Sequence, residues 1–68
     1  PHDTDFLLYL AFAHKQRRNF ELACDFSERL RLRDPRNFKN LMLLCEIYMH
    51  MKNIKKSESI LSQLDEIS

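Results

Sequence analysis

The side chains that most often carry catalysis are few in this chain and lie far apart along it. Its histidines are His2, His14 and His50, and its cysteines are Cys24 and Cys45. No His-Glu-x-x-His motif occurs, and no Cys/His set has the spacing of a zinc site. A glycine-rich phosphate loop is also absent, because the chain contains no glycine. The sequence therefore predicts a protein that is not an enzyme and that holds no metal or cofactor.

The surroundings of these residues favour packing over chemistry. Cys24 and Cys45 lie in apolar helical patterns, where we expect buried free thiols. His14 falls on the apolar framework and is expected to pack in the core, whereas His50 is expected to be exposed. Unpaired cysteines, no N-glycosylation sequon and no signal peptide together predict an intracellular, cytoplasmic setting.

Positive charge gathers in the middle of the chain, although the net charge is only +1. All eleven lysines and arginines lie between Lys15 and Lys56, a stretch that can contact phosphates. However, Arg29, Arg31 and Arg33 cannot share one helical face, and no aromatic stacking platform interleaves with them. Nucleic-acid contact is therefore the weaker alternative to solvated helix faces.

Periodicity predicts four helices and no strands, hence an all-α fold in a single domain, residues 1–68. We expect helices over residues 4–16, 20–33, 37–51 and 54–67. Asp3 or Thr4 is the expected N-cap of the first helix, and Asn19 and Asn53 are those of the second and fourth. Asp34-Pro35 ends the second, because a residue before proline avoids the helical region.

Residues 6–13 read FLLYLAFA, an unbroken apolar run. This run is too short for a membrane span, which takes about 20 residues. A surface helix needs only one apolar stripe, so the other faces of this helix are expected to contact protein. The chain begins at Pro1 rather than Met, so we expect a fragment or a processed chain.

The chain matches itself at an offset of 34 residues. The matched pairs are Leu7 with Leu41, Leu10 with Leu44, Ala11 with Cys45, Arg18 with Lys52, Asn19 with Asn53, Phe20 with Ile54 and Leu30 with Leu64. Two helical hairpins of one period are therefore expected. Small Ala11 and Cys45 should allow their partner helices to approach closely. We also expect the fourth helix to present one apolar face, made by Ile54, Ile60, Leu61, Leu64 and Ile67.

This pattern resembles the tetratricopeptide repeat, with one copy at residues 4–37 and a second at 38–68. The framework residues are Leu7, Leu10, Ala11, Phe20, Ala23 and Pro35 in the first copy, and Leu41, Leu44, Cys45, Tyr48 and Ile54 in the second. The resemblance implies two hairpins of an α-solenoid and a non-catalytic role in protein–protein interaction. Arg18 and Lys52 replace the family's turn glycines. A left-handed non-glycine residue costs about 1–2 kcal/mol, so we expect these turns to be wound differently.

The resemblance also implies that the first helix of each repeat lines a partner-binding groove. Its groove positions are Asp5, Leu8, Phe12 and Lys15 in the first copy and Lys39, Met42, Glu46 and Met49 in the second. Leu8 and Phe12 stand where a clamp for acidic tails needs Lys and Asn, which counts against that role. An apolar groove fits an amphipathic helix or a hydrophobic peptide better. The alternative is that these residues pack against a neighbouring repeat or capping helix.

The remaining apolar side of the first helix is expected to be a stacking face, with Phe6, Tyr9 and Ala13 on it. It would be covered by a second copy in a homodimer, in which Phe12 also takes part, or by neighbouring repeats of a longer array, since two repeats alone are marginal. Two roles remain open besides a peptide-binding adaptor: a small chaperone for a hydrophobic, for example secreted, substrate, and a scaffold subunit of a large assembly.

Overall fold

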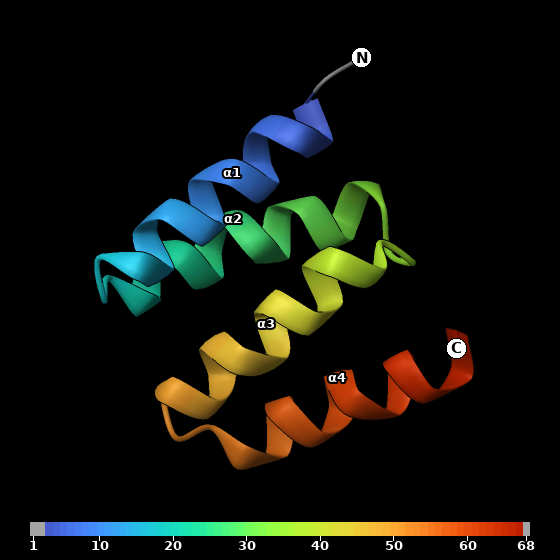
Figure 1. Ribbon diagram of the computed structural model, residues 1–68. Helices are drawn as coiled ribbons and strands as arrows, with labels where there is room; N and C mark the ends of the chain where they lie inside the picture. Colours follow the sequence, from blue (N-terminus) through green and yellow to red (C-terminus); the bar gives the residue numbers. More distant parts are fainter. Residues whose placement is uncertain (1–2, 68) are drawn as a thin grey trace.

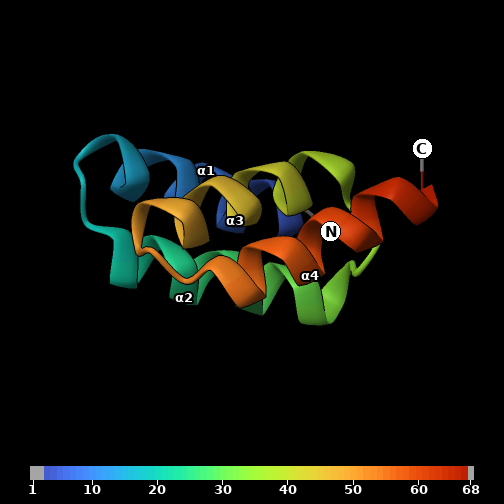
Figure 2. The same ribbon diagram turned by 90° about the horizontal axis from the view of Figure 1, so that it is seen from below.

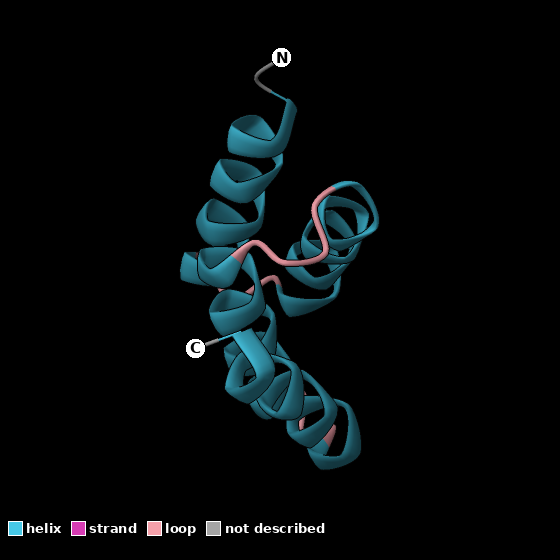
Figure 3. Cartoon of the chain, turned by 90° about the vertical axis from the view of Figure 1, so that its right-hand side faces the viewer, coloured by secondary structure: helices cyan, strands magenta, loops and turns pink. Residues whose placement is uncertain are grey.

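The computed structural model describes residues 3–67, which form four helices joined by short loops (Figure 1). The helices are α1 (Asp3–Gln16), α2 (Phe20–Arg33), α3 (Phe38–His50) and α4 (Ile54–Ile67). Figure 3 shows only helices and loops over this range. The predicted all-α fold of two helical hairpins is therefore confirmed.

The helices lie in two layers. Seen from below, α1 and α3 share one layer while α2 and α4 share the other (Figure 2). Helix α1 packs against α2 and α3 against α4, and the two hairpins meet mainly through α2 and α3. This arrangement leaves α1 and α3 side by side, with a light contact between them.

Most helix ends lie where the sequence predicts them. Helix α1 begins at Asp3, so Asp3 and Thr4 are helical residues and their expected role as N-cap was wrong. Asn37 caps α3 by accepting the Asn40 N–H at 2.9 Å, which moves the start of that helix to Phe38. Its C-cap is Met51, so α3 ends one residue earlier than expected.

The two predicted asparagine caps behave differently. Asn53 Oδ1 accepts the backbone N–H of Lys56 at 3.3 Å and so satisfies one free donor at the start of α4. Asn19 occupies the N-cap position of α2, but its side chain makes no capping hydrogen bond.

Both hairpin turns use a left-handed residue that is not glycine. Arg18 has φ 63° and Lys52 has φ 62°, and the two residues lie 34 positions apart in the chain. The expectation that these turns would be wound differently for want of glycine was wrong. The backbone keeps the left-handed conformation at both turns, although it brings the Cβ atom of each residue close to the following carbonyl oxygen.

The hydrogen bonds of the turns explain why this conformation persists. Each turn contains the pair of backbone bonds that defines a Schellman motif, in which the last carbonyls of a helix find donors. The bonds run from the N–H of Arg18 to Lys15 (2.9 Å) and of Asn19 to His14 (2.8 Å), and from the N–H of Lys52 to Met49 (3.0 Å) and of Asn53 to Tyr48 (2.9 Å).

Small side chains sit at the closest approach within each hairpin. Ala11 and Ala23 are fully buried together in the first hairpin. In the second, Cys45 faces Ser57, with the thiol sulfur and hydroxyl oxygen 3.3 Å apart. The Ser57 hydroxyl also lies 3.3 Å from the Cys45 carbonyl oxygen and can donate to it. Both cysteines are free but only half-buried, less than expected.

The junction of α2 with α3 combines apolar packing with a buried polar pair. Leu43 and Ile47 of α3 pack against Ala23 of α2. Beside them, the Ser27 hydroxyl donates to Asn40 Oδ1 at 2.6 Å, and Asn40 Nδ2 donates to the Ser27 carbonyl at 3.0 Å. Both residues are fully buried. Each provides hydrogen-bond partners for polar groups of the other, which would be costly to bury without a partner.

The two copies of the framework are not equally covered. Leu41 and Leu44 are fully buried, whereas their counterparts Leu7 and Leu10 are only half-buried. The difference arises because α2 covers α3, while no helix within residues 3–67 covers α1 in the same way.

The apolar face expected on α4 is also incomplete. Ile60 and Leu64 are buried and Ile67 is half-buried, but Ile54 and Leu61 are exposed. These two lie on the outer side, where a further helix would have to lie to cover them.

Tyr48 links the second hairpin to α2. It is buried, and its hydroxyl donates to the Glu28 carboxylate. Burial raises the pKa of the Tyr48 phenol above its ordinary value of 10.0, and the side chains of Cys24 and Glu28 raise it further. The folded protein therefore holds this proton more tightly than the unfolded chain does.

The strained turns predict a gain in stability from glycine. Arg18→Gly and Lys52→Gly should each raise the free energy of unfolding by about 0.5–1 kcal/mol, because relief of left-handed strain exceeds the added entropy of the unfolded chain. Urea denaturation followed by circular dichroism measures the change. Arg17→Gly, at the preceding C-cap, is the matched control and should destabilise. Destabilisation by all three variants would contradict the assignment of strain.

The raised pKa of Tyr48 predicts that the folded protein loses stability at alkaline pH. Because its pKa is raised on folding, its contribution is fully present below pH 10 and is lost as the pH rises above it. Other groups titrate there too, so the measured quantity is the difference in unfolding free energy between the wild type and Tyr48→Phe. That difference should stay constant up to about pH 9 and shrink as the pH rises from about 10 to about 11. A difference independent of pH would refute the buried, bonded phenol.

Candidate functional site

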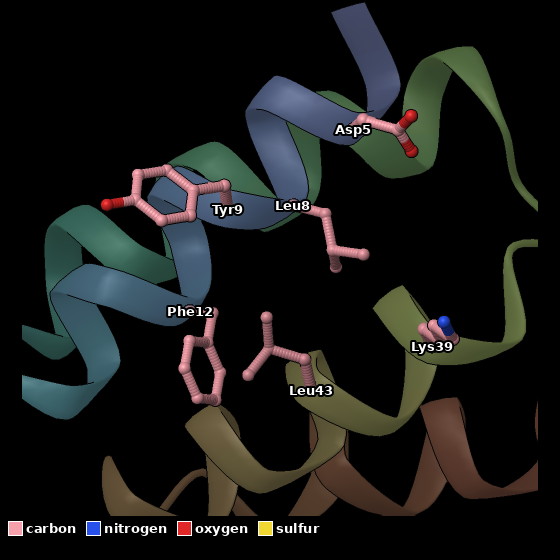
Figure 4. A pocket seen from close by; sticks show the side chains of 6 residues that line it. All are labelled: Asp5, Leu8, Tyr9, Phe12, Lys39 and Leu43. Atoms are coloured by element: carbon pink, nitrogen blue, oxygen red, sulfur yellow. The ribbon is translucent and has the colours of Figure 1, made fainter. Parts of the chain in front are cut away.

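A pocket of about 360 Å³ opens between α1 and α3 on the layer that these two helices share (Figure 4). It is lined from α1 by Asp5, Leu8, Tyr9 and Phe12, and from α3 by Lys39 and Leu43. We call this the α1–α3 groove.

Helical spacing explains how these residues converge. The four lining residues of α1 follow one another at steps of three, one and three positions, which places them along one side of the helix. Lys39 and Leu43 are four apart and so lie one turn from each other on α3. Two neighbouring helices thus turn lining faces toward a common space.

The groove has an apolar floor and aromatic walls. Leu43 is buried at its base, and Leu8 packs against the apolar cluster to which Leu43 belongs. Tyr9 and Phe12 also line the groove and remain 66% and 48% exposed. Exposed aromatic rings of this size supply much of the contact energy where proteins bind one another.

The two ends of the groove differ in charge. Asp5 of α1 and Lys39 of α3 both lie on the side of the groove away from Phe12 (Figure 4), and neither forms an ion pair with another residue in 3–67. Near Phe12, Lys15 Nζ pairs with Glu46 Oε2 at 3.0 Å and lies 5.6 Å from the centre of the Phe12 ring. This ion pair ties α1 to α3, and the Lys15 side chain is only 14% exposed.

The structure distributes the predicted groove residues over two hollows. Asp5, Leu8, Phe12 and Lys39 line the α1–α3 groove, whereas Glu46 and Met49 line a neighbouring hollow together with His50. Lys15 joins the two through its ion pair with Glu46. Met42 is exposed and lines neither hollow.

Leu43 is the groove residue that sequence reasoning missed. The resemblance to the repeat implies a groove position at Met42 and none at its neighbour Leu43. The available signal is that Leu43 lies one helical turn after Lys39 and 34 positions after Tyr9. Tyr9 itself was assigned to the stacking face, and it also lines the groove.

The predicted stacking face lies beside the groove and is open. Phe6 is 62% exposed, Tyr9 is exposed as well, and Ala13 is half-buried. No described residue of α3 or α4 covers these side chains in the way that α2 covers α3.

The histidines pack against aromatic rings. His14 stacks on Phe26 with ring centres 5.6 Å apart and is half-buried, and its Nδ1 is buried without a hydrogen-bond partner. His50 is exposed, as expected, and stacks on Phe20 at 4.6 Å. His2 lies outside the described residues. Within residues 3–67, no cluster of three or more His, Cys, Asp or Glu side chains is placed to hold a metal ion.

Part of the basic surface is paired within the chain. Arg29 bonds Asp25 at 3.1 Å, and Arg31 bonds Glu28 at 3.1 Å. In the described part of the chain, no helix combines the length and the apolar character required to cross a membrane.

Comparison with known proteins gives no match, whether with protein-family models, curated proteins or solved structures.

The Lys15–Glu46 pair predicts a measurable coupling across the groove. In a double-mutant cycle with Lys15→Met and Glu46→Gln, the coupling energy in unfolding should be about 0.5–1 kcal/mol, because Lys15 is largely shielded although Glu46 is half exposed. The exposed Asp25–Arg29 pair on α2 is the matched control, with a coupling of about 0.3 kcal/mol. Equal coupling in the two pairs would show that the groove pair has no special role.

Proposed function

We propose that this chain is a non-catalytic protein-interaction module that holds an amphipathic helix or an apolar peptide in the α1–α3 groove. The observation that carries the proposal is the groove itself: an apolar floor, two exposed aromatic walls, and Asp5 and Lys39 at one end. An amphipathic helix presents apolar residues at steps of three and four, which suits such a surface.

The charged side chains at one end of the groove can orient a bound segment. Asp5 and Lys39 offer a carboxylate and an ammonium to a bound segment. A ligand with one basic and one acidic residue beyond its apolar anchors can pair with both. Charged groups of this kind fix orientation and register more than they add affinity.

We further propose that the two hairpins are repeats of the tetratricopeptide type. The left-handed turn residues 34 positions apart support this, because their hydrogen bonds match. Small residues at equivalent close contacts, Ala11 with Ala23 and Cys45 with Ser57, support it too. The sharing of one layer by the first helix of each hairpin agrees with a groove on that side (Figure 2).

A chaperone for a hydrophobic, for example secreted, substrate is the second candidate. Met42 and Met49 are exposed on α3, and methionine side chains adapt to irregular apolar surfaces. A chaperone of this kind binds many unrelated apolar segments, whereas an adaptor selects one pattern. The same surface serves both roles, so the breadth of the bound sequences separates them.

Selection from a displayed library of random peptides tests the proposal. Enriched peptides should carry apolar residues at steps of three and four. Phe12→Asp should weaken binding of a representative enriched peptide about tenfold or more, the loss expected on removing one buried ring.

Leu22→Asp, on the exposed side of α2, is the matched control and should leave binding unchanged. Circular dichroism checks that both variants are folded. Equal loss in the two variants would refute the groove as the binding site. Enrichment of apolar peptides without a common spacing would favour the chaperone.

A further inference from the structure

The contact between α2 and α3 shows which side of α1 is left without a partner. Asn40, Leu43 and Ile47 are three residues of α3 that are buried where α2 packs on it. The residues 34 positions earlier are Phe6, Tyr9 and Ala13. The sequence therefore repeats on α1 the positions that are buried on α3, yet Phe6 and Tyr9 are the more exposed of the aromatic residues on α1.

We propose that a second copy of the chain covers this face, with the two α1 helices antiparallel about a two-fold axis near Tyr9. The proposal concerns the open face of α1, which adjoins the α1–α3 groove at Tyr9. Phe6 and Ala13 lie at equal distances from the middle of this arrangement. Each large ring therefore lies opposite a small methyl group of the other copy, and the small residue allows the helices to approach.

Charge favours this orientation. Helix α1 begins with Asp3 and Asp5 and is followed at its other end by Arg17 and Arg18. Antiparallel pairing brings the acidic end of each helix beside the basic end of the other, so the charges attract. Parallel pairing would set like charges against each other.

Charge also disfavours a head-to-tail stack, in which α4 of one copy would cover α1 of the next as α2 covers α3. Phe20 of α2 contacts His50 at the end of α3, so the covering helix runs antiparallel to the helix it covers. The acidic end of α4, with Glu66, would then meet the acidic start of α1. The basic start of α4, with Lys55, would meet the arginines at the end of α1. Like charges oppose each other at both ends.

The proposed antiparallel dimer is also a closed assembly, to which no third chain can add through the same surface. A two-fold interface uses the same patch on both copies and stops at two chains, whereas a head-to-tail contact continues into a filament. Pairing through α1 leaves Leu8 and Lys39 of each groove off the two-fold axis. Tyr9 and Asp5 belong both to the groove and to the proposed interface.

Sedimentation equilibrium of the whole chain tests the proposal. The mass should rise with concentration from 8.2 kDa to about twice that value and go no further. Phe6→Asp should remain monomeric at concentrations where the wild type is dimeric. Leu61→Asp, on the open face of α4, is the matched control and should dimerise normally. A monomer at every concentration, or a mass rising beyond two chains, would overturn the proposal.

Charge reversal tests the orientation without touching the apolar contact. Asp5→Lys should weaken the dimer about tenfold, because the symmetry repeats each lost attraction. The double variant Asp5→Lys with Arg17→Asp should recover most of that loss. Added salt should weaken the wild-type dimer, since it screens attraction between opposite charges. Stronger association in salt, or no recovery in the double variant, would exclude the antiparallel arrangement.

Discussion

Helix α2 lies between α1 and α3, and its packing on α3 sets the arrangement of the rest of the molecule. Ile47 and Leu43 are buried in that contact, and Ser27 and Asn40 bond each other within it. Because α2 belongs to the first hairpin and α3 to the second, the same contact joins the hairpins and sets α1 beside α3. The α1–α3 groove exists because of that placement. The same placement explains why Leu7 and Leu10 stay half-buried while their counterparts Leu41 and Leu44 are fully buried.

Tertiary packing also explains why the turns tolerate local strain. A left-handed arginine or lysine is unfavourable by itself. At Arg18 and Lys52 the Schellman bonds and the antiparallel packing that follows require this conformation. The contacts made along two whole helices outweigh a cost confined to one residue. Arg18 recovers part of that cost because its guanidinium lies 5.2 Å from the centre of the Phe20 ring.

Helix α1 carries more apolar surface than its own hairpin uses. One side packs Ala11 against Ala23, a second lines the groove with Leu8 and Phe12, and a third presents Phe6 and Tyr9. Helix α3 has the same three sides, and α2 already covers the third. The proposed peptide site and the proposed dimer interface are therefore two uses of the surface by which α1 differs from α3.

The sequence by itself determined the class, the number of helices and most of their boundaries, because these depend on local periodicity and on residues such as Asn53 and Pro35. The family resemblance of the sequence implied groove positions that include Asp5, Leu8, Phe12 and Lys39, and these four line the α1–α3 groove. Only the tertiary structure decided that Leu43 completes the groove, that Met42 lies outside it and that Lys15 pairs with Glu46. It alone showed that Ile54 and Leu61 stay exposed. Those outcomes depend on the distance and angle between helices, which follow from packing over the whole molecule rather than from the spacing of residues within one helix.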